Sequence, residues 1–170
     1  MKKIIVGILF ILLLSSCTSI PKYENGKALI ILPVKTEKIK GKEFYIYYRI
    51  HYGLVSNDTY FPKEYIYFTP SSKKYIAFIL PEGVYKITDI EPIRKSDSRK
   101  FATYSTNITF SCKDGIIRII PTQLEVVLNK GIKGIVNQRI SASPVEVELY
   151  NDIISELKNE DNFQYWNECE

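Results

Sequence analysis

Few side chains in this sequence could do chemistry. The cysteines are Cys17, Cys112 and Cys169, and His51 is the one histidine. Any Ser-His-Asp or Cys-His mechanism would therefore have to use His51. That histidine lies in an alternating strand pattern, and no Gly-x-Ser-x-Gly elbow accompanies it. We therefore interpret His51 as a residue on a sheet surface and predict no catalytic residue.

The acidic residues and glycines give no stronger signal of catalysis. Carboxylates are scattered through predicted turns, without the pairing that a glycosidase would need: Glu82, Asp89, Glu91, Asp97 and Asp114. One histidine and no Cys-x-x-Cys predict no metal site. The glycines stand singly, so no phosphate-binding loop is expected. The sequence favours a non-enzymatic protein without a cofactor.

An aromatic stripe is the feature most suggestive of binding. Residues 43–52 alternate, so that Phe44, Ile46, Tyr48, Ile50 and Tyr52 share one face of a strand. The opposite face carries the candidate contact patch: Tyr45, Tyr47, Arg49 and His51. Tyrosine offers a large contact area with a polar tip, which suits recognition of a protein or a glycan. Tyrosine also favours strands, so a purely structural role remains an alternative.

The N-terminus has the layout of a secretory signal. Lys2 and Lys3 precede the apolar run Ile4 to Leu14, and this run of 11 residues is shorter than the roughly 20 that span a bilayer. The following residues, Leu14-Ser15-Ser16-Cys17, resemble the lipobox of bacterial lipoproteins. The resemblance implies cleavage before Cys17 and attachment of lipid to that cysteine. An ordinary secretory signal is the alternative.

This resemblance implies an address and a membrane partner. Stable attachment needs at least two acyl chains, which a lipoprotein cysteine carries. The expected location is the bacterial cell envelope, with the protein held on the membrane through Cys17. Thr18 stands where some inner-membrane lipoproteins have aspartate, so the outer membrane is favoured if the organism has two membranes.

Three segments follow from this interpretation. Residues 1–16 are the signal peptide, residues 17–27 a lipidated tether, and residues 28–170 one domain. The mature chain carries 21 basic and 19 acidic residues, without the clustered basic excess of a nucleic-acid protein. Cys112 and Cys169 could form a disulfide outside the cytoplasm. Alternatively, Cys112 is a small buried side chain and Cys169 a free thiol in a frayed tail.

Alternating patterns and turn residues predict a mainly β fold. Strands are expected at 28–35, 43–52, 65–69, 74–80, 84–90, 101–112, 116–120, 123–128 and 132–139. The turns at 81–83, 114–115 and 130–131 predict that consecutive strands are mostly hairpin partners. Ser143, Pro144 and Glu146 form a capping-box pattern that predicts a helix at about 144–159. The expected fold is an antiparallel β-sandwich or curled sheet with one C-terminal helix.

One short segment adds a family resemblance. Residues 78–87, Phe-Ile-Leu-Pro-Glu-Gly-Val-Tyr-Lys-Ile, resemble the strand, turn and strand of prealbumin-like and carboxypeptidase-regulatory-like sandwich domains. This resemblance implies a sandwich fold and no catalytic residue. The sequence therefore predicts a lipid-anchored domain that binds another envelope protein or a glycan, or that has a structural role. The alternative is an envelope hydrolase whose site is assembled from residues far apart in the sequence.

Replacement of Cys17 by serine tests the anchor. The Cys17→Ser variant should not incorporate a fatty-acid analogue in the cell, because it lacks the sulfur that accepts the diacylglyceryl group, and it should stay uncut or soluble. The measurement is metabolic labelling followed by purification. Labelling that persists in this variant would refute the lipobox interpretation.

Overall fold

The computed structural model describes residues 20–38, 46–56, 59–69, 74–94, 98, 100, 102–130 and 136–167. These residues contain strands at all nine predicted places. They are β1 (Lys27–Lys38), β2 (Ile46–Ser56), β3 (Thr59–Phe68), β4 (Tyr75–Pro81), β5 (Gly83–Arg94), β6 (Tyr104–Cys112), β7 (Ile117–Ile119), β8 (Thr122–Lys130) and β9 (Val136–Pro144). Helix α2 (Val147–Lys158) and the 3-10 turn η2 (Phe163–Tyr165) follow.

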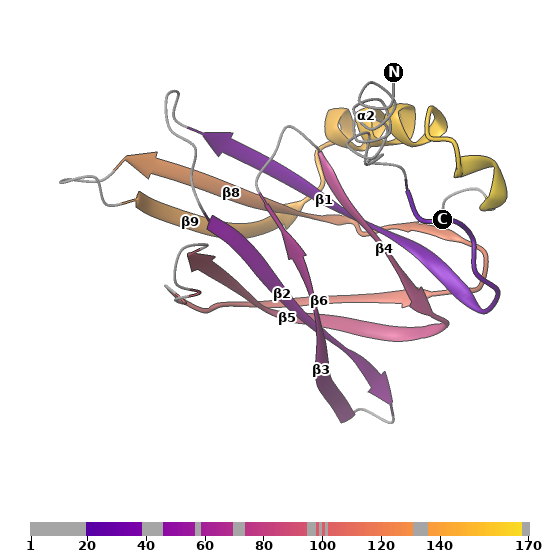
Figure 1. Cartoon of the computed structure of the whole chain (residues 1–170), viewed down its shortest axis with the longest axis horizontal. Coiled ribbons are helices and arrows are strands. Elements are labelled where there is room, and N and C mark those ends of the chain that lie inside the picture. Colours follow the sequence, from indigo (N-terminus) through magenta and orange to yellow (C-terminus); the bar gives the residue numbers. More distant parts are fainter. Residues whose placement is uncertain are drawn as a thin grey trace, which may run out of the picture.

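The strands form two sheets that face each other (Figure 1). The first has the order β4-β1-β8-β9, with β7 also paired to β1, and the second has the order β3-β2-β5-β6. Apolar side chains from both sheets fill the space between them, and those of the second sheet include Tyr48, Ile50 and Ile87. The predicted fold class, a mainly β sandwich-like structure with one C-terminal helix, is confirmed.

Strand β1 departs from the expected antiparallel pattern. It pairs with β4 antiparallel, but with β7 and then β8 parallel along its other edge. Residues Ala28 to Leu32 are fully buried on both faces. A continuous apolar run of this kind is typical of a strand in a parallel arrangement, because such strands are covered on both sides. The run at the start of β1 was therefore the sequence signal for this pairing.

Two predicted hairpins are crossovers between the sheets. The turn at 81–83 leads from β4 in the first sheet to β5 in the second, and the turn at 114–115 leads from β6 back to β7. The residues of a turn favour a change of chain direction, but they do not specify whether the next strand joins the same sheet or the other one. The predicted pairing of the strands on either side of 130–131 is confirmed, since β8 and β9 are antiparallel neighbours.

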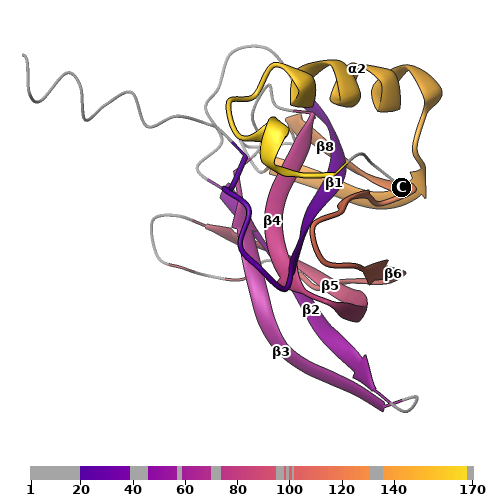
Figure 2. The ribbon, with the colours of Figure 1, turned by 90° about the vertical axis from the view of Figure 1, so that its right-hand side faces the viewer.

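A second apolar cluster lies between the first sheet and helix α2. Figure 2 shows the helix lying across the face of this sheet that points away from the second sheet. Ile153 and Leu157 of the helix are fully buried against Leu29 and Ile31 of β1. Side chains that alternate along β1 therefore face two different cores.

The helix begins three residues later than the capping-box pattern predicts. Ser143 and Pro144 belong to strand β9, and the Ser143 hydroxyl donates to Glu125 Oε1 at 3.1 Å. Glu146 is the N-cap residue, and its backbone N–H donates to Oε1 of the buried Gln123 at 3.1 Å. A distant glutamine thus accepts from the backbone at the helix start, whereas Ser143 stays in the sheet.

The predicted tether at 17–27 is wrong for the part that the structure describes. Ile20 is 1% exposed and packs in the cluster beneath α2. Asn162 Nδ2 donates to the Ile20 carbonyl at 2.8 Å, and Trp166 Nε1 donates to the Pro21 carbonyl at 3.0 Å. Residues 20–27 therefore belong to the folded domain, because the chain after the helix returns to hold them.

The chain after the helix is docked up to Asn167. Trp166 is 6% exposed, and the edge of its ring meets Tyr23 at a centroid distance of 5.3 Å. The backbone N–H of Asn167 donates to the Gly115 carbonyl at 2.8 Å. Gly115 has a φ of +72°, and a Cβ there would lie 2.8 Å from Asn167 Nδ2. Glycine at this turn therefore permits both the backbone conformation and the close approach of the tail.

Truncation of Trp166 should loosen residues 20–23 and the segment after α2 together. We expect Trp166→Ala to lower the free energy of unfolding by about 3–5 kcal/mol, because it leaves a cavity beneath residues 20–23. Urea unfolding of the protein from residue 18 onward measures the effect. Tyr165→Ala, which removes a neighbouring ring that is 60% exposed, is the matched control and should change stability by less than about 0.5 kcal/mol. Equal losses from both variants would contradict the docking.

Candidate binding site on the second sheet

The predicted contact patch lies on the outer face of the second sheet. Strand β2 runs between β3 and β5, with Arg49 opposite Tyr67 on one side and Glu91 on the other. Ile46, Tyr48, Ile50 and Tyr52 are buried in the core, as alternation predicts. Tyr47, Arg49 and His51 are partly exposed on the opposite face, which confirms their predicted placement. Tyr45 lies outside the described residues.

Glu91 stands at the centre of a cluster of basic side chains. Arg49 donates to Glu91 Oε2 through Nε at 2.9 Å and also through Nη2. His51 Nε2 lies 3.0 Å from the same oxygen, and Lys100 Nζ donates to Oε1 at 2.9 Å. Glu91 is 7% exposed, whereas Arg49 and His51 keep about 30% of their side-chain surface. The buried carboxylate thus holds these partly exposed side chains in place.

The basic partners keep Glu91 ionised. Burial by itself raises the pKa of this carboxyl, but the hydrogen bonds from Lys100, His51 and Arg49 outweigh burial and lower the pKa to about 2. The hydrogen bonding between Arg49 and Glu91 also raises the pKa of the Arg49 guanidinium. Glu91 is therefore a fixed anion at neutral pH, and its charge is compensated by its partners.

Two exposed tyrosines of β3 border this cluster. Tyr65 and Tyr67 are 50% and 52% exposed, and their ring centroids lie 5.2 Å apart. The Arg49 guanidinium carbon stands 5.5 Å from the centre of the Tyr65 ring, in a cation–π arrangement. Tyr67 also meets Tyr47 edge to face at 5.3 Å. We call the set Tyr47, Arg49, His51, Tyr65, Tyr67 and Glu91 the tyrosine face.

Sequence reasoning missed half of this face. The sequence pattern places Glu91 in or near a turn, but this residue lies within β5, which extends to Arg94. Tyr65 and Tyr67 were placed in a predicted strand without a role. Their alternation with Ile66 and Phe68, which pack on the core, was the signal that could have added them to the patch. The alignment with Arg49 depends on strand pairing, which the sequence did not reveal.

The cysteines are only partly described. Among the described residues Cys112 has no disulfide partner; it is buried between the sheets, as its inward position predicts, and burial raises the pKa of its thiol to about 12. Cys17 and Cys169 lie outside the described residues. Lipidation of Cys17 and the pairing of Cys112 with Cys169 therefore stay predictions.

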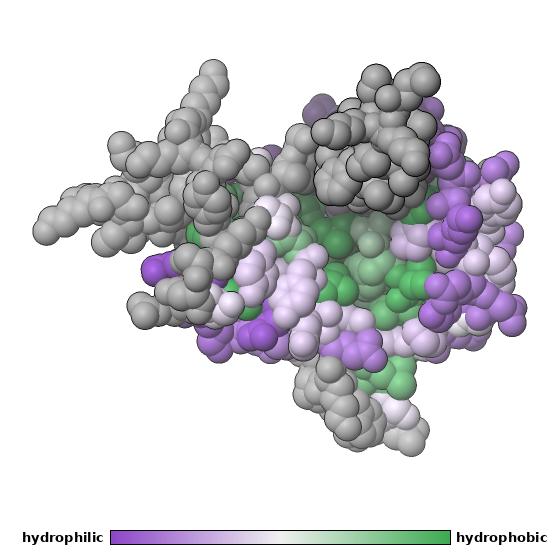
Figure 3. Space-filling model, viewed as in Figure 1, coloured by the Kyte–Doolittle hydropathy of each residue, from purple (hydrophilic) through white to green (hydrophobic). Residues whose placement is uncertain are grey.

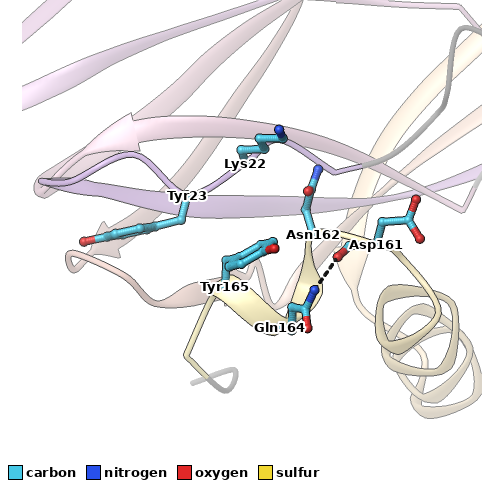
Figure 4. Close-up of a pocket in the computed structure, with 6 residues that line it drawn as sticks. All are labelled: Lys22, Tyr23, Asp161, Asn162, Gln164 and Tyr165. Carbon is cyan, nitrogen blue, oxygen red and sulfur yellow. Dashed lines mark hydrogen bonds between the residues drawn. The ribbon is translucent and has the colours of Figure 1, made fainter.

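Hollows elsewhere on the molecule offer other candidates. A cavity of about 570 Å³ lies between the edge strands β6 and β9, and polar residues such as Thr103, Asn107 and Ser141 line it. Figure 3 shows apolar residues at the centre of one face of the molecule. In the same view of the ribbon, the edge strands β3 and β4 lie nearest the viewer (Figure 1). A second hollow, of about 470 Å³, lies beside Tyr23 and Tyr165 (Figure 4).

The described residues contain neither a metal-binding cluster nor a membrane-spanning helix. Among them no group of three or more His, Cys, Asp or Glu side chains is arranged to hold a metal ion. No helix in the described ranges is both long and apolar enough to cross a bilayer.

Comparisons with known proteins do not assign this chain to a family. No protein-family model and no curated protein sequence matches it. A solved structure with similarity is a leucine-rich repeat protein from Bacteroides thetaiotaomicron VPI-5482, at 14% sequence identity and a TM-score of 0.36. The match covers 59% of this chain and 14% of that protein.

Neutralising Glu91 should weaken the fold in a pH-dependent way. We expect Glu91→Gln to cost about 1–3 kcal/mol at pH 7, because charge-assisted hydrogen bonds to Arg49, His51 and Lys100 are lost. Since the folded pKa of about 2 lies below the ordinary 4.5, this contribution is complete above pH 4.5 and disappears as pH falls toward 2. The variant and the native protein should therefore converge in acid.

Urea unfolding at a series of pH values is the measurement. Asp89→Asn is the control, because Asp89 lies on the same strand but receives a hydrogen bond from Ser105. Its effect should be smaller than that of Glu91→Gln. A constant difference between native protein and Glu91→Gln across the acid range would contradict the ionised state of Glu91.

Proposed function

We propose that this chain is a lipid-anchored, non-enzymatic lipoprotein of the bacterial cell envelope, and that the tyrosine face binds another envelope component. The observation that carries the binding proposal is the pair Tyr65 and Tyr67, half exposed beside a compensated charge cluster. The other outer face of the sandwich is covered by helix α2. The lipobox resemblance at Leu14 to Cys17 supports the address.

The tyrosine face suits recognition because its side chains are already ordered in the absence of a partner. Arg49 is fixed by Glu91 and by the ring of Tyr65, so little rotamer entropy remains to be lost on binding. Tyrosine and arginine are enriched among the residues that dominate protein interfaces. The cluster beneath them is hydrogen-bonded, so contact would bury few unsatisfied groups.

A protein partner is favoured over a glycan. Sugars stack on open aromatic faces, but Arg49 covers one face of Tyr65, and the neighbouring rings meet edge to face. The face therefore offers ring edges, hydroxyls and a guanidinium group. These groups fit the mixed polar and apolar surface of a folded protein.

The alternative is a hydrolase that uses His51. Its favouring observation is the 3.0 Å contact between His51 Nε2 and Glu91, since a carboxylate orients the histidine in many hydrolases. However, Glu91 is also bound by Arg49 and Lys100, so its charge is already compensated. In the described part of the chain, the side-chain hydrogen bond of His51 is to Glu91 and not to a serine, threonine or cysteine nucleophile.

Crosslinking tests the tyrosine face. The protein is crosslinked in intact cells and purified, and its partner is identified by mass spectrometry. The double variant Tyr65→Ser, Tyr67→Ser should weaken binding of that partner by at least about tenfold, or ~1.4 kcal/mol. Val84→Ser is the control, because Val84 is an exposed side chain near the start of β5 in the same sheet.

The variant His51→Ala distinguishes the binding proposal from the hydrolase alternative. His51→Ala should change partner recovery less than the double tyrosine variant does. If any phenotype of the gene is lost with folded His51→Ala and kept in the double tyrosine variant, the hydrolase is favoured and the binding proposal fails.

A further inference from the structure

The segment that leads from the lipidation site is fixed to the domain. Ile20 is buried beneath α2, and the carbonyls of Ile20 and Pro21 accept hydrogen bonds from Asn162 and Trp166. The chain that approaches Ile20 from Cys17 therefore ends at a rigid point of the fold.

The distance from Cys17 to this fixed point is short. Cys17 precedes Ile20 by three positions, and three extended residues reach at most about 11 Å. A domain of this size has a radius of gyration of about 15 Å. The domain therefore cannot stand away from the bilayer by its own width, and the surface around Ile20 lies close to the lipid.

That surface carries side chains typical of a membrane interface. Tyr23 and Tyr165 are 38% and 60% exposed, and with Lys22 they border the hollow of about 470 Å³. Figure 4 shows Lys22 and Tyr23 on the N-terminal segment, with Tyr165 on the turn that follows α2. Tyrosine rings favour the headgroup level of a bilayer, and lysine can extend its ammonium group to lipid phosphates.

We propose that Lys22, Tyr23 and Tyr165 form a membrane contact surface that lies in the headgroup region of the bilayer. This inference rests on the proposed lipid anchor at Cys17. Asp161 also borders the hollow, so the surface is not polybasic, and its contact with lipid depends on the tyrosine rings more than on attraction to anionic headgroups.

The contact surface also sets the orientation of the domain. Residues 20–23, α2 and Trp166 cover one outer face of the sandwich, and the tyrosine face is the outer face of the opposite sheet. When the face covered by α2 lies against the bilayer, the tyrosine face points away from the membrane. A partner could then approach it without competition from lipid.

Photocrosslinking of the lipidated full-length protein tests this arrangement. The purified protein is placed in vesicles of phosphatidylethanolamine and phosphatidylglycerol that contain radiolabelled phospholipid. Benzoylphenylalanine replaces Tyr165 in one variant and Tyr67 in another, two tyrosines of similar exposure. The probe at position 165 should take up several-fold more labelled lipid than the probe at position 67. Near-ultraviolet circular dichroism verifies that both variants are folded.

The controls separate the contact surface from the anchor. The position-165 variant of the protein from residue 18 onward, which has neither signal peptide nor lipid, should neither float with the vesicles nor take up label. If the lipidated protein floats but position 165 takes up no more lipid than position 67, the contact surface is refuted and the anchor stands. If the native chain carries no lipid and does not float, the proposed anchor fails, and the inference fails with it.

Discussion

The whole structure depends on the burial of strand β1 on both faces. Ala28, Ile30 and Leu32 face the core between the sheets, and Leu29 and Ile31 face the opposite way. Exposing either set to water would forfeit about 25 cal/mol for each Å² of apolar surface. The second sheet covers one face, and α2, with the segments that hold it, covers the other. Layer order, crossovers and the docked tail all follow from this requirement.

The second sheet obeys a different constraint, because its outer face has no covering layer in the described structure. Side chains there must tolerate water, and tyrosine, arginine and histidine do so while still packing on one another. Glu91 is the exception, since burial of a carboxylate is costly unless cations accompany it. Arg49 and Lys100 provide that compensation, and His51 adds a further contact to the same carboxylate.

The two outer faces therefore differ in chemistry for a physical reason. One is apolar and closed by the helix and both ends of the described chain, and the other is polar, aromatic and open. The proposed anchor at Cys17 would act on the closed side, which leaves the open side for the proposed recognition. The sandwich separates the two proposed tasks by its own thickness.

The sequence by itself determined the local elements. Alternating patterns, short apolar runs and turn residues placed all nine strands, and the capping-box pattern predicted the helix to within three residues of its start. It also put Arg49 and His51 on the outer face, because side chains in a strand alternate whatever the partner strand is. Such properties depend on neighbours in the chain, which the sequence contains directly.

Tertiary structure decided which distant residues meet. The parallel partners of β1, the crossovers at 81–83 and 114–115, and the helix start at Val147 all depend on contacts between remote segments. The same holds for Glu91, which became the centre of the candidate site only when β5 paired with β2. A pairing register arises from the burial of whole faces, and no short stretch of sequence carries that information.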